Sequence, residues 1–433
     1  MKNYALIVSS IILTLLFTAC GGSSNKPGVG QGIVAKPQSC DLNSQKQFIF
    51  DVMHDTYLWY DEVPTVDIND FDDLNSTLDA LKAPLDRFSF INSLEANDNF
   101  FEQGTFEGFG FRAVINEPRD AYQIAFVFNN SPSGAAGWKR TDRITAINGV
   151  SAANIINGDG LNAALVGDTA TFTIGDLSAP ASDQVLTKAL VIMNTVLTAD
   201  IVTTETQNIG YIALSSFIEN TSKEFSDAID LLKAANVDEL VLDLRYNGGG
   251  RVIASRNVAS YIGGDLTKDF NFSKTTHNNK YTQSNATNPF QNFSNSLGLS
   301  RVYVLTSQST CSASELVINS LSPFLEVVQI GATTCGKPVG MYGKTFCDKI
   351  LLPIEFQSVN NNDEGDYFDG LPADCPAIDD LTHDFADPAE SMLSTAIFHM
   401  NNSSCQTLAK ANLHRTLKTK HLDNNWLPQK QVN

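Results

Sequence analysis

The sequence is short of positive charge and of long apolar runs. Of its 433 residues, 29 are Lys or Arg and 48 are Asp or Glu, so the formal net charge is −19 at pH 7. A nucleic-acid partner needs a basic face for its phosphates, and a polybasic membrane contact needs clustered Lys or Arg. The charge argues against both partners. No apolar run reaches the roughly 18 residues that cross a bilayer, so attachment to a membrane would require an anchor.

Motifs for metals and nucleotides are also missing or incomplete. The sequence has no His-Glu-x-x-His zinc helix and no Cys-x-x-Cys pair. The stretch from Gly331 to Lys337 matches the Gly-x-x-x-x-Gly-Lys pattern of a phosphate loop. However, Pro338 stands where that loop needs a Ser or Thr hydroxyl for Mg²⁺. We therefore expect neither a metal nor another cofactor.

What is present suits a globular protein with an export signal. Apolar residues make up 42% of the chain and charged residues 18%, which is ordinary for domains with a buried core. One Lys precedes a mostly apolar run from Ala5 to Ala19, which predicts a signal peptide over residues 1–19. Phe17-Thr18-Ala19-Cys20 resembles a bacterial lipobox, so we expect lipidation of Cys20 and a flexible tether over residues 20–40. An ordinary signal with an incidental Cys is the alternative.

The remaining cysteines predict disulfides. They number six, an even count: Cys40, Cys311, Cys335, Cys347, Cys375 and Cys405. In an exported chain such a count favours up to three disulfides, and six cysteines allow 15 pairings. The pairing therefore stays open. Cys335 and Cys347 are close in sequence and are our first candidate pair.

The chain changes character along its length. Residues 41–100 show helical spacing of apolar side chains, residues 101–195 are β-rich, and residues 196–405 alternate strands and helices as in an α/β core with parallel pairing. Residues 269–296 are rich in Asn, Ser and Thr and predict a long loop. A polar tail, expected to be poorly ordered, follows over residues 406–433.

The β-rich segment resembles a PDZ domain. It opens with Gly108-Phe109-Gly110-Phe111 and continues with Asp142-Arg143-Ile144 and Ile147-Asn148-Gly149. PDZ domains hold a peptide's C-terminal carboxylate on backbone N–H groups of a Gly-Φ-Gly-Φ loop and add the peptide as a strand. The resemblance implies that residues 108–111 bind peptide ends. A generic β-sandwich is the alternative.

Three segments of the predicted α/β core carry groups suited to nucleophilic catalysis. A Gly-rich loop over residues 244–250 follows one buried strand, Ser312 starts a helix after a second strand, and Lys337 follows a third. A helix N-terminus favours a developing negative charge. The N–H of Ala313, with that of Gly248 or Gly249, is suited to hold a tetrahedral oxyanion.

A Ser nucleophile needs a base, and Lys337 is the better candidate. A Lys in an apolar site loses several pKa units and then accepts a proton at neutral pH. No His stands at a comparable strand end, although sequence order alone leaves a Ser-His-Asp triad open. Glu315 completes a capping box with Ser312, so a purely structural role for this Ser is the competing interpretation.

Taken together, the segments resemble the C-terminal processing peptidases, the S41 family of serine-lysine proteases. The resemblance covers roughly residues 45–400 and includes a Gly-Lys 25 residues beyond Ser312, which is Lys337. It implies Ser312 as nucleophile, Lys337 as general base, and an oxyanion hole from Ala313 with Gly248 or Gly249. The implied fold is mixed α/β and multidomain, with a helical N-terminal region, a PDZ-like domain and a ClpP/crotonase-like protease core. Glu315 is expected to be structural.

The resemblance also implies substrates and a location. We expect protein or peptide substrates with free C-termini, drawn from unfolded or tagged cell-envelope proteins. No Asp follows Cys20, which implies the periplasmic face of the outer membrane of a Gram-negative bacterium. Membrane contact would come only through the lipid anchor.

Two departures from the family pattern keep an alternative open. Pro338 replaces the usual Gly, and Met341 stands where many members carry a Gln that orients the Lys. A PDZ-bearing lipoprotein that binds peptides without cleaving them is therefore the alternative. Cys311 and Cys335 flank the two reactive residues, and a disulfide between them is a second hypothesis on pairing, which would brace or gate the site.

Overall fold

The computed structural model describes residues 34–176 and 180–406. The predicted signal peptide, Cys20, most of the predicted tether and the tail from residue 407 lie outside the described residues. Within the described ranges, no helix is long and apolar enough to cross a membrane.

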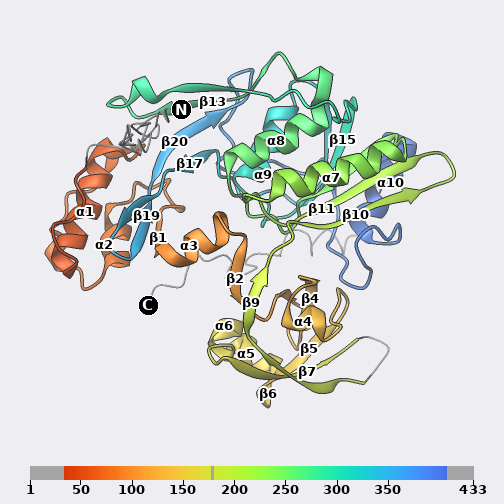
Figure 1. The fold of residues 1–433 in the computed structure, drawn as a ribbon, viewed down its shortest axis with the longest axis horizontal. Coiled ribbons are helices and arrows are strands. Elements are labelled where there is room, and N and C mark those ends of the chain that lie inside the picture. The colour runs from red at the N-terminus through yellow and green to blue at the C-terminus, as the bar shows by residue number, and fades with distance from the viewer. Residues whose placement is uncertain (1–33, 177–179, 407–433) are drawn as a thin grey trace, which may run out of the picture.

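The described chain alternates helices and strands (Figure 1). The helices are α1 (Leu42–Asp55), α2 (Leu74–Leu81), α3 (Leu94–Phe101), α4 (Pro132–Ala135), α5 (Ala152–Asn157), α6 (Gly160–Ala164), α7 (Thr221–Ala234), α8 (Val252–Gly263), α9 (Ala313–Leu321) and α10 (Ser391–Asn402). The strands are β1 (Phe90–Ser93), β2 (Thr105–Gly108), β3 (Phe111–Ile115), β4 (Tyr122–Val127), β5 (Arg143–Ile147), β6 (Val150–Ser151), β7 (Thr169–Gly175), β8 (Ser182–Thr187), β9 (Ala189–Ile192), β10 (Val196–Thr203), β11 (Asn208–Leu214), β12 (Glu239–Asp243), β13 (Asn271–His277), β14 (Ala286–Pro289), β15 (Arg301–Thr306), β16 (Glu326–Gly331), β17 (Val339–Met341), β18 (Lys344–Phe346), β19 (Lys349–Leu352), β20 (Ile354–Val359) and β21 (Cys375–Pro376).

The N-terminal region is helical, as its apolar spacing indicates. Asp41 and Asp73 cap α1 and α2, because each carboxylate accepts a backbone N–H three residues on. The two helices bury their apolar faces with side chains of β18 and β19, including Phe346 and Leu351. A segment some 300 residues distant in sequence thus completes this core.

The central sheet has the order β10-β11-β12-β15-β16-β21. Strand β10 pairs antiparallel with β11, and every other neighbouring pair is parallel. One core cluster joins this sheet to side chains of α7, α8 and α9, and another joins it to α10, so helices cover both faces. The predicted α/β core with parallel pairing is confirmed.

A second sheet has the order β14-β13-β20-β17, and a third has the order β1-β19-β18. The predicted long loop over residues 269–296 is wrong, because β13 and β14 form an antiparallel pair there and β13 also pairs with β20. Phe272 and Phe290 anchor the pair in the core, with ring centroids 5.5 Å apart. The Asn-, Ser- and Thr-rich composition hid these strands, since the polar side chains bond across the pair, as Asn288 does to Ser273 and Thr275.

Residues 111–187 form a separate β body, which the β2–β9 pair connects to the rest (Figure 1). Its sheet follows the path β3-β4-β5-β7-β8, with β6 pairing to β5. Phe109 and Gly110 lie between β2 and β3, and β3 stands at one end of the strand order. An added Cβ at Gly110 would lie 2.0 Å from the Cβ of Ser131, at a φ of +83°, so only glycine fits there.

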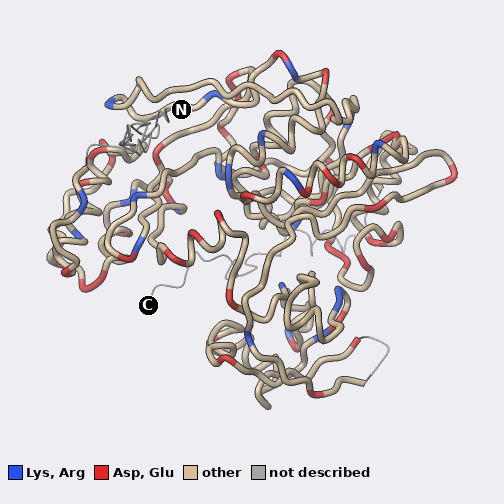
Figure 2. Tube along the Cα trace, in the orientation of Figure 1, with Lys and Arg blue, Asp and Glu red and all other residues tan. Residues whose placement is uncertain are grey.

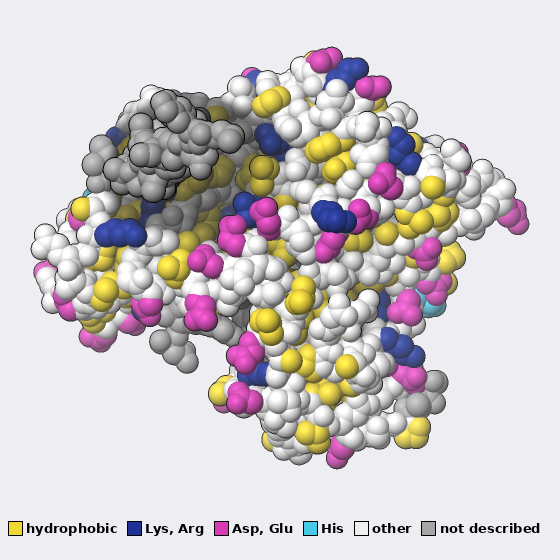
Figure 3. Space-filling view, viewed as in Figure 1, with side chains coloured by type: hydrophobic (Ala, Val, Ile, Leu, Met, Phe, Trp, Pro, Cys, Tyr) yellow, Lys and Arg dark blue, Asp and Glu magenta, His cyan; other side chains and the backbone are white. Residues whose placement is uncertain are grey.

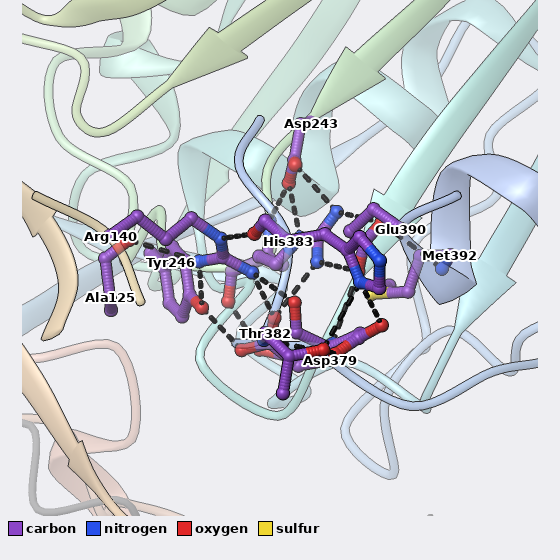
Figure 4. A network of polar contacts seen from close by, with 12 residues as sticks. Ala125, Arg140, Asp243, Tyr246, Asp379, Thr382, His383, Glu390 and Met392 are labelled. Atoms are coloured by element: carbon purple, nitrogen blue, oxygen red, sulfur yellow. Dashed lines mark hydrogen bonds and ion pairs between the residues drawn. The ribbon is translucent and has the colours of Figure 1, made fainter. Parts of the chain in front are cut away.

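A buried polar network joins this β body to the central sheet (Figure 4). Arg140 of the β body donates to Asp379 at 2.7 Å and to the Tyr246 hydroxyl at 2.8 Å. Arg245, which is 1% exposed, bonds to Asp379, Asp243 and Glu390. Burial by itself raises the pKa of Asp379. The positive charges of Arg140 and Arg245 outweigh this effect and lower the pKa to about 2. Because Arg245 and Tyr246 open the Gly-rich loop, the network connects the β body to that loop.

Acidic residues occur in all parts of the described fold, with basic residues interspersed (Figure 2).

Candidate active site

Three loops meet at one edge of the central sheet. Strands β12, β15 and β16 are parallel neighbours, so their carboxyl ends lie at the same edge. The Gly-rich loop, the Ser312 turn and the Lys337 loop follow these three strands in that order. Ligands of open α/β sheets bind outside the carboxyl ends of the strands, and the candidate residues lie there.

Ser312 stands in a strained turn at the N-terminus of α9. Its φ is +57° and its ψ −114°, a conformation that costs a non-glycine residue about 1–3 kcal/mol and is concentrated at active sites. Gly249 packs directly against this turn. An added Cβ at Gly249 would lie 2.9 Å from the Ser312 Cβ and 3.0 Å from the Ala313 nitrogen. The glycine thus permits the close approach of the two loops.

Asn247 holds the Gly-rich loop and the Ser312 turn together. Its side chain is fully buried, donates to the Leu214 carbonyl at 3.1 Å and accepts the Gly249 N–H at 2.9 Å. Its carbonyl accepts the Cys311 N–H and the Ser314 hydroxyl. This role of Asn247 was not predicted, although an Asn directly before three glycines is a signal for a side chain that bonds a turn.

Lys337 lines the same cavity as Ser312, Ala313 and Gly248. Its Nζ lies over the Phe88 ring, 5.3 Å from the ring centroid. Burial lowers the pKa of Lys337 to about 8, against the opposing charges of Asp86 and Glu315. An amine with this pKa is partly neutral near neutral pH, which a general base requires. Met341, at the position of the family's Gln, also lines the cavity.

Glu315 connects the Ser312 turn to the Lys337 loop. Its buried carboxylate accepts the N–H groups of Ser312, Gly336 and Lys337 at 2.7–2.8 Å, and it also accepts the Thr334 hydroxyl. Burial raises its pKa, and these donors oppose the rise. The structural role expected for Glu315 is therefore larger than a helix cap, because one carboxylate sets the distance between two loops.

A disulfide between Cys311 and Cys335 joins the same two loops, with Cα atoms 5.1 Å apart. The other pairs are Cys40–Cys347 and Cys375–Cys405. The expectation of up to three disulfides and the hypothesised Cys311–Cys335 pair are confirmed. The first candidate pair, Cys335–Cys347, is wrong, because Cys347 follows β18, which packs with the N-terminal helices where Cys40 lies.

The cysteines and Glu315 do not form an open metal site. The ligand atoms of Cys311, Glu315 and Cys335 lie within 4.8 Å of one another. However, the two sulfurs are bonded to each other, and backbone N–H groups occupy the carboxylate. This cluster is therefore closed to a metal while the disulfide is intact.

The N-terminal region supplies a further part of the site that our sequence analysis missed. Arg87 donates to the carbonyls of Cys335, Gly336 and Phe368 at 2.8–3.1 Å. Asp86 accepts the Phe88 and Ser89 N–H groups, which orders the turn that places the Phe88 ring. These residues are about 250 positions from Lys337, and no motif marks them.

Among the predicted oxyanion donors, Ala313 and Gly248 line the cavity. The Gly249 N–H is already bonded to Asn247 Oδ1 at 2.9 Å. In this conformation the Gly249 N–H is bonded inside the loop, which favours Gly248 of the two predicted alternatives. The glycine at position 249 permits the close approach of the Ser312 turn. Gly108, Phe109, Gly110 and Phe111 do not line this cavity but lie at the edge of the β body.

The cavity measures about 800 Å³, and its lining includes the apolar side chains of Phe90, Ile253, Leu316, Leu352 and Phe356. The face of the molecule shown in Figure 3 is hollowed between the N-terminal helices and the core, and hydrophobic side chains lie in the hollow. None of the His residues within 34–176 and 180–406 lines it. The described cavity therefore contains the Lys that the sequence predicted as base and no described His.

The chain is similar in sequence to known peptidases. The sequence profile of peptidase family S41 matches residues 208–375, and that of the peptidase S41 N-terminal domain matches residues 44–90. The carboxyl-terminal-processing protease of Picosynechococcus is 27% identical over 244 residues, covering 54% of this chain and 55% of the relative. The carboxy-terminal processing protease CtpB of Bacillus subtilis is 26% identical over 243 residues, covering 54% and 47%. The chain thus spans about half the length of these curated relatives.

A solved structure shares the fold along most of the chain. A Bacteroides fragilis protein assigned to the S41 proteases superposes with a TM-score of 0.68 at 24% identity, covering 82% of this chain and 97% of that one. The two profiles match in the expected order, the N-terminal one on α1 and α2 and the other on the strands and loops that carry Ser312 and Lys337. The two family models and the curated relatives therefore support placing this chain with the C-terminal processing peptidases of family S41.

Proposed function

We propose that the protein is a serine endopeptidase that cleaves peptide bonds through a Ser312–Lys337 dyad. The observation that carries the proposal is one cavity that holds a strained Ser at a helix N-terminus and a Lys with a lowered pKa. The departures at Pro338 and Met341 do not remove this arrangement. The Phe88 ring stands beneath the Lys amine, a contact that favours one orientation of the side chain.

In the proposed reaction, Lys337 Nζ takes the proton of Ser312 as Oγ attacks the substrate carbonyl. The resulting oxyanion accepts hydrogen bonds from the N–H groups of Ala313 and Gly248. Lys337 then protonates the leaving amine, and an acyl-enzyme forms on Ser312 Oγ. A water that Lys337 deprotonates hydrolyses this ester and restores the Ser hydroxyl.

For substrates, we propose unfolded or C-terminally tagged proteins of the cell envelope. The β body would present them, with the Gly108–Phe111 loop holding a chain-end carboxylate and β3, at the end of its sheet, accepting an added strand. We further propose that Cys20 anchors the protein to the periplasmic face of a Gram-negative outer membrane. Three disulfides in the structure suit an oxidising compartment.

Cleavage of a disordered protein tests the proposal. A form starting after Cys20 and its Ser312→Ala variant would be incubated with a disordered substrate, and the products followed by mass spectrometry. We expect cleavage by the parent alone. Binding without cleavage by both proteins would instead support the peptide-binding alternative, and equal cleavage by both would assign the activity elsewhere.

Loss of the Cys311–Cys335 bond is expected to lower activity. The bond joins the residue before Ser312 to the second residue before Lys337, and misplacement of reacting groups by about 1 Å costs up to roughly 100-fold. We expect the Cys311→Ala/Cys335→Ala variant to lose about ten- to a hundredfold in kcat. The Cys375→Ala/Cys405→Ala variant, which lacks a bond away from the cavity, is the matched control. Equal kcat values for the two double variants would contradict a bracing role.

A further inference from the structure

Arg256 lies on α8, the helix that follows the Gly-rich loop, and lines the cavity that contains Ser312 and Lys337. The residue is half-buried. Its Nε is inaccessible to solvent and has no hydrogen-bond partner among the described residues. A buried N–H group without a partner costs about 1–3 kcal/mol, so its retention here calls for an explanation.

The positive charge of Arg256 also has no acidic partner among residues 34–176 and 180–406. Burial lowers its pKa, and no acidic neighbour opposes that effect. Arg251, five positions earlier and in the same cavity, provides the contrast, because it pairs with Glu102 at 2.8 Å and Glu219 at 2.7 Å. The described chain therefore neutralises one cavity arginine with two carboxylates and leaves the other without any.

Two acidic residues line the cavity, but neither pairs with Arg256 among the described residues: Glu102 pairs with Arg251, and Asp98 has no ion pair with Arg256. The second sheet contributes Thr275, Asn288 and Ser358 to the lining, all of them neutral. Arg remains protonated at neutral pH despite burial, and its planar guanidinium binds a carboxylate through two parallel hydrogen bonds. In a partly dehydrated cavity the electrostatic attraction between the two charges of such a pair is stronger than at the surface. A carboxylate of an incoming ligand would supply the hydrogen-bond partner and the negative charge that Arg256 lacks.

We propose that Arg256 is a specificity-determining residue that binds a carboxylate of the bound peptide. The proposal rests on the proposed protease function, because it assigns the ligand to a substrate in the same cavity. Two sources share this chemistry: an Asp or Glu side chain near the cleaved bond, and the carboxylate at the end of the chain. The protein would then prefer acidic segments or chain ends over neutral internal ones.

The test uses fluorogenic peptides that differ only in the carboxylate. One arm compares Glu with Gln at each position from three before to three after the cleaved bond, and the other compares a free with an amidated C-terminus. We expect the parent to show a ten- to hundredfold higher kcat/KM for the carboxylate form in one arm, and the Arg256→Gln variant to show a ratio near one. Arg251→Gln is the matched control and should keep the parent's ratio.

The outcomes separate this proposal from the proposed function. A parent that cleaves peptides without preference in either arm, or an Arg256→Gln variant that keeps the preference, would overturn the role of Arg256 alone. If the parent cleaves nothing, the protease proposal fails. Calorimetric binding of the same peptides to the Ser312→Ala variant then still decides the role of Arg256. Tighter binding of the carboxylate form, lost in Ser312→Ala/Arg256→Gln, supports it, and equal binding of both forms overturns it.

Discussion

The Lys337→Met variant is expected to lose about 10²–10⁴-fold in kcat, the range that a positioned general base contributes. Met keeps much of the side-chain volume over the Phe88 ring but cannot accept a proton. The Lys337→Arg variant should be as inactive as the Met variant, because Arg keeps the charge but does not deprotonate at accessible pH. Single-turnover cleavage of a fluorogenic peptide would measure both.

Lys349→Met is the matched control, since its ammonium pairs with Asp348 at 2.7 Å and does not line the cavity. It should retain the parent's rate. Substantial activity in Lys337→Arg would contradict the role of Lys337 as a base and would point to a purely electrostatic one.

The pH profile of the parent provides an independent readout of the same group. The neutral amine is the active form, and burial lowers the pKa of Lys337 to about 8. The rate should therefore rise about tenfold per pH unit below this value and level off above it. A rate that stays flat between pH 6 and pH 9 would be inconsistent with Lys337 as the base.

The Arg245→Met variant is expected to destabilise the protein by about 3–5 kcal/mol, the usual cost of breaking a buried ion pair. Arg245 is 1% exposed and bonds to three carboxylates, those of Asp243, Asp379 and Glu390. Removing it takes the described ion-pair partner from buried Asp243 and Glu390, whereas Asp379 keeps Arg140. Because the residue also opens the Gly-rich loop, activity should fall with stability. Urea unfolding followed by intrinsic fluorescence would measure the change.

Lys223→Met is the control for this prediction. Its partner Asp227 lies one helical turn away, and the side chains are 80% and 63% exposed. Surface pairs of this kind contribute at most about 0.5 kcal/mol. An Arg245→Met midpoint no lower than that of Lys223→Met would show that the network in Figure 4 does not carry stability.

The candidate site was predictable from sequence where it depends on order along the chain. The parallel strands and the loops that follow them could be recognised from apolar runs and glycines, and Ser312 and Lys337 occupy such loops. The polar composition of residues 269–296 misled us, because hydrophobic alternation is the main signal for strands and these strands are held by few buried aromatics. The hydrogen bond from the Gly249 N–H to Asn247 could not be predicted from the sequence either, because it depends on the geometry of the turn.

The sequence by itself therefore determined the resemblance to family S41, the mixed α/β architecture and the two candidate reactive residues, because local periodicity marks the elements and ordered motifs carry the resemblance. Only the tertiary structure decided which cysteines pair, across separations as large as 307 residues. It also placed Phe88 and Arg87 against the Lys337 loop. Likewise, only the folded chain shows that Arg251 is neutralised and Arg256 is not. The physical reason is that burial and charge pairing are set by neighbours in space, which long-range packing brings together.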